Sequence, residues 1–347
     1  MLPAENREKL LGFAQPDSRG RLSPHQLFLL PSSAHMRAAI IFGLGCSQKN
    51  LKPFQAHADV HDLHITWRIG RPTASDEADV ILLFGGDGTI HRHLGQLVRL
   101  GLPVLVIPAG SGNDFACALG LRRVSDSVAA WRKFCGNATN ATNVRTIDLG
   151  TITPLEDAGG SFDTRYFCCA AGVGLDAEVS RRANRLPRWV RGHGGYALSL
   201  IPTAFQFAPL PMKILTPVED ASGTAHEANW KTSSDQPTIL AAFANTRTYG
   251  GGMKIAPHAK LDDGLLDVCV IGSMNPFKLF CLFPTVYSGG HLQIREVEYF
   301  QANRLRVETD RPVDVYADGE YVCRTPVEVT VQHGAIRVIV HPSQTSF

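Results

Sequence analysis

Short apolar runs followed by Gly-rich loops characterise residues 36–145. The segments AAIIF (38–42), HITWRI (64–69), VILLF (80–84) and VLVIP (104–108) predict four β-strands, and VILLF is apolar enough to be covered on both faces. A helical pattern follows the loops after the third and fourth strands. Two consecutive units of strand, Gly-rich loop and helix imply a parallel sheet with helices packed against it, so this part is predicted to be an α/β domain.

The helix after VILLF decides between two interpretations of GGDGT (85–89). Asp87 followed by Gly88 is a good β-hairpin signal. However, the apolar positions after Thr89 have the spacing of one helix face, which leaves no second strand for a hairpin. The helix is expected to end at Gly101. Its apolar positions are Ile90, Leu94, Leu97 and Val98.

From Thr146 onward, short alternating strands are separated by Gly, Pro and Asp turns. This spacing predicts an antiparallel, β-rich second domain over residues 146–333, interrupted by one helical segment at about 176–206. A last strand within residues 334–347 is expected to return toward the first domain. Residues 1–35 are expected to form an N-terminal extension that packs against that domain. The predicted strands are RYFCCAAGV, MKILTPV, TILAAFAN, LLDVCVI, RLRVET, VDVYA, VEVTV and AIRVIV.

Composition narrows the class of protein. The length of 347 residues favours two domains, and the formal net charge of +2 is too small to indicate nucleic-acid binding. The eight cysteines include no C-x-x-C pair, which favours a reducing, cytoplasmic compartment. No window approaches the roughly 20 apolar residues that span a bilayer, and the start of the chain lacks a signal-peptide pattern. Any membrane contact is therefore expected to be peripheral.

The loop GGDGT has the composition of a phosphate-binding site. Glycines let backbone N–H groups approach a ligand, and the following helix adds a positive dipole end with unpaired donors. The next strand ends in AGSGND (109–114), and ligands of open parallel sheets bind where such loops meet. Alternatively, Ser111 or Asn113 serves only as a helix N-cap. The P-loop and protein-kinase motifs do not occur in the sequence, so a nucleotide site here would be of neither type.

Two acidic turns in the second domain are candidates for chemistry. The segment YGGGMKIAPHAKLDDGLLDV (249–268) contains three carboxylates that suit a hard cation such as magnesium, although a plain Asp-Asp-Gly turn is the alternative. The turn ADGEY (317–321) is either a simple hairpin or, if it borders a cleft, the source of a general base. The three carboxylates of the first turn are Asp262, Asp263 and Asp267.

Three further features have simple structural explanations. The Cys168–Cys169 pair is expected on a strand within the core. Residues 181–191 carry five arginines in a stretch without acidic residues, which fits either an anionic membrane surface or a solvated helix face. A metal site on one helix face is disfavoured, because the last of its three histidines opens a strand. These histidines are His57, His61 and His64.

Taken together, these segments resemble the diacylglycerol kinase catalytic family, which includes bacterial lipid kinases and the sphingosine and ceramide kinases. The resemblance covers residues 36–342. It implies a nucleotide domain like those of phosphofructokinase and NAD kinases, a β-sandwich second domain and a cleft between the two. The matching stretches are ITW (65–67), GGDGTI (85–90), PAGSGNDFA (108–116), AAGVGLDAEV (170–179), residues 249–268 and DGE (318–320).

The resemblance also implies roles for individual residues. Glu320 falls on the proposed proton acceptor, with Asp318 beside it. Asp87 belongs to the signature whose aspartate is essential, and we interpret it as a positioning residue. The implied magnesium ligands are Asp263 and the main-chain carbonyls near Lys260 and Leu265. The implied ATP-contacting positions are Thr66, Gly85, Gly86, Asp87, Gly88, Thr89, Ile90, His91 and Ser111.

The implied function is an ATP- and Mg²⁺-dependent lipid kinase that phosphorylates a hydroxyl of diacylglycerol, a sphingoid base or ceramide at the inner face of the membrane. Two departures from the family pattern keep alternatives open. The first loop is GLGCS (43–47) instead of Asn-Pro-x-Ser-Gly, and His91-Arg92 replaces the usual Asn-Glu. The alternatives are an NAD-kinase-like phosphotransferase acting on a soluble substrate and a catalytically silent lipid-binding protein. A homodimer is left open as the oligomeric state.

Overall fold

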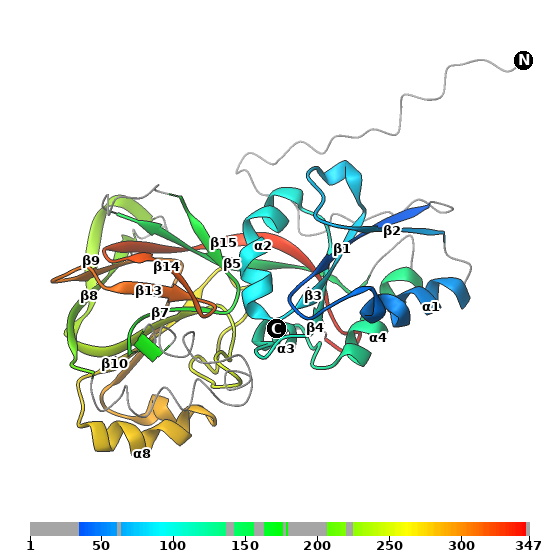
Figure 1. Ribbon diagram of the computed structural model, residues 1–347. Helices are drawn as coiled ribbons and strands as arrows, with labels where there is room; N and C mark the ends of the chain where they lie inside the picture. Colours follow the sequence, from blue (N-terminus) through cyan, green and yellow to red (C-terminus); the bar gives the residue numbers. More distant parts are fainter. Residues whose placement is uncertain are drawn as a thin grey trace, which may run out of the picture.

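The protein consists of a parallel sheet with its helices and a β-rich second domain beside it (Figure 1). The helix α2 (Asp87–Leu100) lies between the two. This architecture confirms the predicted fold class. The computed structural model describes residues 35–60, 64–136, 142–155, 163–175, 178–179, 207–219 and 225–344.

The parallel sheet contains the four strands that the apolar runs predict. They are hydrogen-bonded in the order β2 (Ile65–Ile69), β1 (Met36–Phe42), β3 (Val80–Gly85) and β4 (Val104–Pro108), and all run in the same direction. Every residue of the central strand β3 is buried, as its uninterrupted apolar sequence indicates. The carboxyl ends of β1, β3 and β4 therefore meet at one edge.

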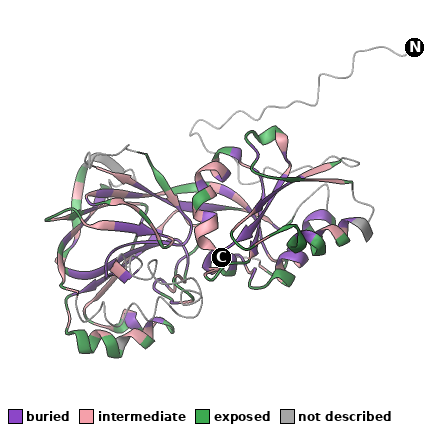
Figure 2. Ribbon diagram, viewed as in Figure 1, coloured by how far each residue is buried: buried purple, intermediate pink, exposed green. Residues whose placement is uncertain are grey.

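Helices cover this sheet and bury its apolar side chains. The ring of Phe54 in α1 (Lys52–Val60) lies 5.5 Å from that of Phe84. Trp131 in α4 (Val124–Gly136) is fully buried and packs against the same sheet. Figure 2 shows that the buried residues concentrate in the strands of both domains.

The helix α2 confirms that GGDGT is not a hairpin turn. It begins at Asp87, directly after β3, and its buried positions include Ile90 and Leu94. It ends at Gly101, which has a φ of 60° and whose N–H donates to the carbonyl of Leu97.

The second domain is built from antiparallel pairs around its own core. The helix α8 (Pro276–Val286) packs on its outer side, and the short helix α3 (Asp114–Ala118) follows β4 in the first domain. The strands are β5 (Val144–Pro154), β6 (Arg165–Phe167), β7 (Ala170–Gly174), β8 (Leu210–Glu219), β9 (Ala225–Ala244), β10 (Leu266–Gly272), β11 (Val297–Ala302), β12 (Arg304–Thr309), β13 (Asp314–Ala317), β14 (Glu320–Arg324) and β15 (Val327–Ile339). Short 3₁₀ helices occur at Gln48–Leu51, Ser75–Glu77 and Gly290–Gln293.

One strand, β15, contributes to both domains. Its first half pairs with β12, and its end pairs with β4 in parallel through Val338 and Val104, while β5 runs antiparallel along its length. Val329 is buried in the core of the second domain, and Val338 is buried in the core of the first. The two predicted strands VEVTV and AIRVIV are therefore one continuous strand, with a register shift between Gln332 and Ile336.

Several predictions need correction or fall outside the described residues. Cys168 and Cys169 are buried as expected, but they form a bend between β6 and β7 and do not lie on a strand. The strands β5, β11 and β14 and the helices α4 and α8 were not predicted. The extension at 1–35 lies outside the described residues except for His35, and the helical segment at 176–206 does so except for residues 178–179.

Within the ranges that the structure describes, no helix is both long and apolar enough to cross a bilayer.

Because Val338 fills the first core from a strand shared with the second, Val338→Ala should destabilise the whole protein. We expect the free energy of unfolding to fall by about 2 kcal/mol in a urea titration, the cost of a buried cavity. Val124→Ala, at a position 40% exposed at the start of α4, should change it by less than about 0.5 kcal/mol. Equal effects of the two substitutions would contradict this role of β15.

Candidate active site

Two Gly-rich loops interlock at the carboxyl ends of β3 and β4. The N–H of Ala109 donates to the carbonyl of Gly85 at 3.2 Å, and the N–H of Asp87 donates to the carbonyl of Gly112 at 3.2 Å. A Cβ atom on Gly86 would lie 2.5 Å from that same Gly112 oxygen, and one on Gly110 would lie 2.4 Å from the Cα of Gly86. Glycine is therefore required where the two backbones approach each other, and the predicted meeting of the loops is confirmed.

Asp87 joins the first loop to the helix that follows the second. Its carboxylate accepts hydrogen bonds from the N–H groups of Asp114 and Phe115, each at 3.1 Å, in the first turn of α3. The pKa of Asp87 is raised to about 7, chiefly by burial and also by the charge of Asp114, while the two N–H donors lower it. The predicted N-cap Asn113 binds Gly110 instead, so the oxygen that caps α3 comes from Asp87.

Asp114 joins the first domain to the second. Its buried carboxylate accepts the N–H groups of Gly251 at 2.9 Å and Gly252 at 3.0 Å, in the GGG turn of residues 250–252. Burial raises the pKa of Asp114, and these hydrogen bonds partly offset the increase. This role of Asp114 was not predicted, although the residue stands in the AGSGND loop, which was a candidate ligand site.

The two acids of DGE have different environments. The side chain of Asp318 is fully buried and accepts the N–H groups of Cys168 at 2.9 Å, Cys169 at 2.8 Å and Ala170 at 3.3 Å. It also accepts a hydrogen bond from Nδ1 of His91 at 3.0 Å. Asp318 has a φ of 50°, which the tight turn into Gly319 requires. These four contacts give Asp318 a structural role.

His91 therefore connects α2 to the second domain. Burial lowers the pKa of its imidazole, but the hydrogen bond and charge of Asp318, together with the charge of Glu320, outweigh this effect and raise it. A charged imidazole forms a stronger, charge-assisted hydrogen bond with the carboxylate. The resemblance assigned His91 to ATP; its ring instead faces Asp318.

Glu320 lies against the first loop. A Cβ atom on Gly88 would be 3.0 Å from Oε1 of Glu320, so the carboxylate lies beside the first turn of α2. Glu320 is half-buried at the start of β14. The structure thus brings GGDGT, the AGSGND loop and DGE together from three distant parts of the chain.

The remaining residues of the first loops lie at the same edge. Oγ1 of Thr89 fills the space beside Gly43, where an added Cβ atom would lie 2.7 Å from it, so GLGCS adjoins GGDGT. Ser111 is exposed in the second loop. Ile90, in contrast, is buried in the core, so the side chain of this predicted ATP-contacting residue faces away from a ligand.

Thr66 is not part of this site. It pairs with Arg37 near the start of β1, and Oγ1 lies 2.6 Å from Nε2 of His35. The Gly-rich loops follow the other ends of the strands, where Phe42 is level with Phe84. The motif match placed Thr66 on the correct strand but at the wrong end of the sheet.

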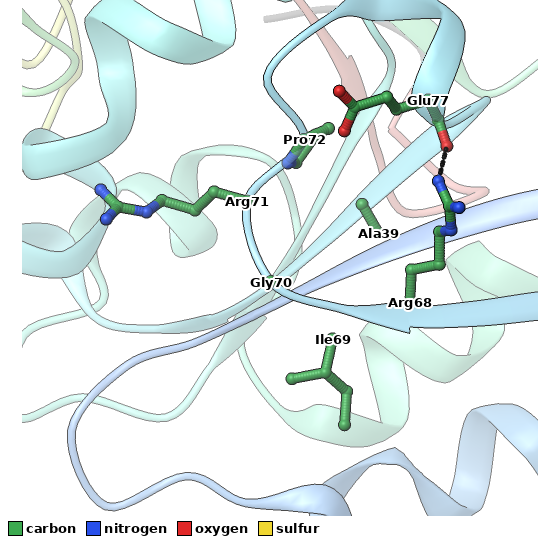
Figure 3. A pocket seen from close by; sticks show the side chains of 7 residues that line it. All are labelled: Ala39, Arg68, Ile69, Gly70, Arg71, Pro72 and Glu77. Atoms are coloured by element: carbon green, nitrogen blue, oxygen red, sulfur yellow. Dashed lines mark hydrogen bonds between the residues drawn. The ribbon is translucent and has the colours of Figure 1, made fainter.

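A pocket lies closer to the loops, near the end of β2 (Figure 3). Arg68 donates to the carbonyl of Glu77 on one side of it, and Arg71 points away from this pair. Its other lining residues are Ala39, Ile69, Gly70 and Pro72.

The predicted magnesium turn contains one suitable carboxylate. Oδ1 of Asp263 accepts the N–H of Leu265 at 3.1 Å. Burial raises the pKa of Asp263, as do the nearby charges of Asp267 and Asp148, and Lys260 lowers it. A half-buried carboxylate close to other carboxylates fits a hard cation. Asp267 is not suitable, because its carboxylate accepts hydrogen bonds from Tyr299 and Gln301.

One other cluster has metal-binding residue types. In the described part of the chain, the only three such side chains within 4.8 Å of one another are Cys168, Cys169 and Asp318. Burial raises the pKa of the Cys168 thiol to about 12, and metals bind the thiolate form. The carboxylate already accepts hydrogen bonds, so this cluster does not fit a metal. Of the three histidines of the disfavoured metal site, His61 lies outside the described residues.

Two parts of the chain match models of known protein families. Residues 47–151 match the diacylglycerol kinase catalytic domain, and residues 169–340 match the YegS C-terminal NAD kinase beta sandwich-like domain. A diacylglycerol kinase of Mycobacterium tuberculosis is 33% identical over 278 residues, which cover 80% of this chain and 82% of the relative. This chain belongs to the diacylglycerol kinase catalytic family.

Other members and solved structures agree with this assignment. A diacylglycerol kinase of Bacillus subtilis is 27% identical over 272 residues, which cover 78% of this chain and 80% of the relative. The crystal structure of a putative diacylglycerol kinase from Bacillus anthracis str. Sterne superposes with a TM-score of 0.65 at 20% sequence identity. The match covers 90% of this chain and 97% of that chain, which shows that the two proteins share a fold. As a member of this family, the protein is a kinase.

Replacing Asp318 should cost stability, because three backbone N–H groups and His91 depend on its carboxylate. We expect Asp318→Asn to lower the free energy of unfolding by about 2–4 kcal/mol in a urea titration. Asp314→Asn, on the same hairpin, removes an ion pair with Arg324 that is partly exposed and should cost less than about 1 kcal/mol. A near-neutral Asp318→Asn would rule out the structural role.

The raised pKa of Asp87 predicts a pH effect on stability. The folded protein holds this proton up to about pH 7, whereas an unfolded aspartic acid releases it near pH 4. The contribution of Asp87 to stability therefore falls as the pH rises from about 4 to 7. Asn cannot titrate, so the free energies of unfolding of the wild type and Asp87→Asn should diverge by roughly 2–4 kcal/mol over this range. A constant difference between the two proteins would contradict the raised pKa.

Proposed function

We propose that this protein is an ATP- and Mg²⁺-dependent lipid kinase, which transfers the γ-phosphate of ATP to a hydroxyl of a lipid. The observation that supports this most directly is the position of Glu320, beside the first turn of the helix that follows GGDGT. A carboxylate next to a phosphate-binding loop is placed to receive the proton of an attacking hydroxyl. The names of the relatives favour diacylglycerol over a sphingoid base or ceramide as the acceptor.

The Gly-rich loops supply the phosphate-binding part of the proposed mechanism. GGDGT presents its backbone at the N-terminus of α2, which is the positive end of the helix dipole. The N–H groups of Asp87 and Thr89 are already bonded to the carbonyls of Gly112 and Gly86. Asp87 acts as a positioning residue, because its carboxylate is occupied by the N–H groups of α3 and holds the second loop against the first. Preorganised donors of this kind stabilise the charge of a phosphoryl group in transfer.

Glu320 is the proposed proton acceptor, and Asp318 is not. The hydroxyl oxygen of the lipid forms the new bond to the γ-phosphorus, the bond to ADP breaks, and the hydroxyl proton moves to the Glu320 carboxylate. Asp318 already accepts four hydrogen bonds, so protonating it would disrupt the hairpin that carries Glu320.

Asp263 is the side chain that would hold magnesium, with the main-chain carbonyls of Lys260 and Leu265 as proposed companions. The ion would supply positive charge against the phosphates. We place the protein in the cytoplasm, acting at the inner membrane face.

Glu320→Gln tests the proposed base. It keeps the size of the side chain and removes its capacity to accept a proton, so we expect the rate of lipid phosphorylation to fall by about 10²–10⁴-fold. Labelled ATP with diacylglycerol, sphingosine and ceramide in mixed micelles gives the rate, and a thermal melt checks the fold. Glu308→Gln, at an exposed position of β12, is the matched control and should retain full activity.

The outcomes of that assay separate the alternatives. Phosphorylation of a soluble nucleotide but of no lipid would support an NAD-kinase-like enzyme. Lipid binding without turnover of ATP by the wild type would support a silent binding protein. Full activity of Glu320→Gln on a lipid would support the lipid kinase and exclude Glu320 as the proton acceptor.

A further inference from the structure

The helix α8 presents an apolar face to the surroundings of the protein. Its sequence, PFKLFCLFPTV, contains one charged residue, and it lies on the outer side of the second domain (Figures 1 and 2). Phe277 is 68% exposed, Phe280 44% and the following Tyr287 43%. With the exposed Cys281 and Pro284, these positions recur at helical spacing and form one face, which we call the outer face of α8.

The opposite side of α8 accounts for its attachment to the domain. Leu279, Phe283 and Val286 pack into a core cluster that also contains Met253. The N–H of Lys254 donates to the carbonyl of Val286 at 3.0 Å. Phe277 of the outer face is not part of that cluster. A globular protein rarely exposes several large apolar side chains together.

The segments that form and flank this face have a net positive charge. No acidic residue occurs from Ser273 to Arg295, nor from Arg247 to Leu261 in the segment that contacts the end of α8. The next acid, Glu296, is paired with Lys278 at 2.6 Å. Besides the paired Lys278, the exposed cations of these segments include Lys254 and Arg295.

We propose that the outer face of α8 docks this protein on an anionic phospholipid bilayer. An apolar helix face with cations beside it lies in the interface of such a bilayer, where its aromatic side chains enter the acyl boundary and the cations face the headgroups. This inference rests on the proposed function, since a lipid acceptor resides in a membrane.

The docking surface is connected to the candidate active site by a short stretch of backbone. The segment that holds the end of α8 through Lys254 begins with Gly251 and Gly252, whose N–H groups bind Asp114. The segment that contacts the end of α8 therefore also contacts Asp114, next to the Gly-rich loops. A bilayer bound at α8 would be bound to the same domain that carries Glu320.

Vesicle sedimentation tests the proposal without using activity. The probe is a set of vesicles of phosphatidylcholine with roughly one-third phosphatidylglycerol, and pure phosphatidylcholine is the comparison. Phe277→Glu puts a carboxylate at the most exposed apolar position of the outer face, and we expect at least about tenfold weaker binding. Phe277→Leu should bind like the wild type, and added salt should weaken wild-type binding.

The control variant introduces the same negative charge at an exposed apolar position of the first domain. Val124→Glu, at an exposed position of α4 in the first domain, should bind vesicles like the wild type. Equal binding by Phe277→Glu and the wild type would overturn the proposal. So would a wild-type dimer that Phe277→Glu converts to a monomer with unchanged vesicle binding, because the face would then join two copies of the chain.

Lipid phosphorylation measured in parallel separates this inference from the proposed function. Wild-type binding that depends on Phe277, without phosphorylation of any lipid, would support the docking surface and reject the kinase. Phosphorylation of vesicle lipid that is insensitive to Phe277→Glu would support the kinase and reject the docking surface.

Discussion

The geometry of the candidate active site depends on one buried carboxylate. Asp318 binds three successive backbone N–H groups of residues 168–170 and the imidazole of His91, so a single side chain ties the DGE hairpin both to its own domain and to α2. Buried N–H groups without an acceptor would cost several kcal/mol, which makes this arrangement hard to exchange for another. Glu320, two residues later, takes its position from the hairpin that Asp318 anchors.

Two more buried aspartates use the same principle. Asp87 binds the amides of α3, and Asp114 binds the amides of the GGG turn. Carboxylates near a phosphate-binding loop would repel its ligand if their charge were not offset. Backbone amide dipoles provide this offset, and the raised pKa values of Asp87 and Asp114 show that the balance is incomplete. The acids around the loops thus hold the loops together, and in the proposed function the phosphate contacts fall to the backbone.

Local pattern was sufficient to find the loops but not to assign their acids. GGDGT and DGE are recognisable because glycine and aspartate at those spacings define tight turns and loops. The division of roles between Asp318 and Glu320 depends on backbone donors about 150 residues away, which no local pattern contains. Thr66 shows a related limit, because a matched motif identifies a strand without showing which of its residues are level with the loops. The helix α8 was missed because it is apolar on both sides and lacks the polar face that reveals most surface helices.

The shared strand β15 has a consequence for how ligands enter and leave. Kinases with separate lobes open and close about a flexible connection, but here the strand β15 runs from one core into the other and is hydrogen-bonded to β5 on both sides of the register shift between Gln332 and Ile336. Large rotation of one domain against the other would have to break this pairing. The shared strand therefore restricts hinge-like rotation of the two domains, and movements near the candidate active site are expected to be confined to side chains and single loops.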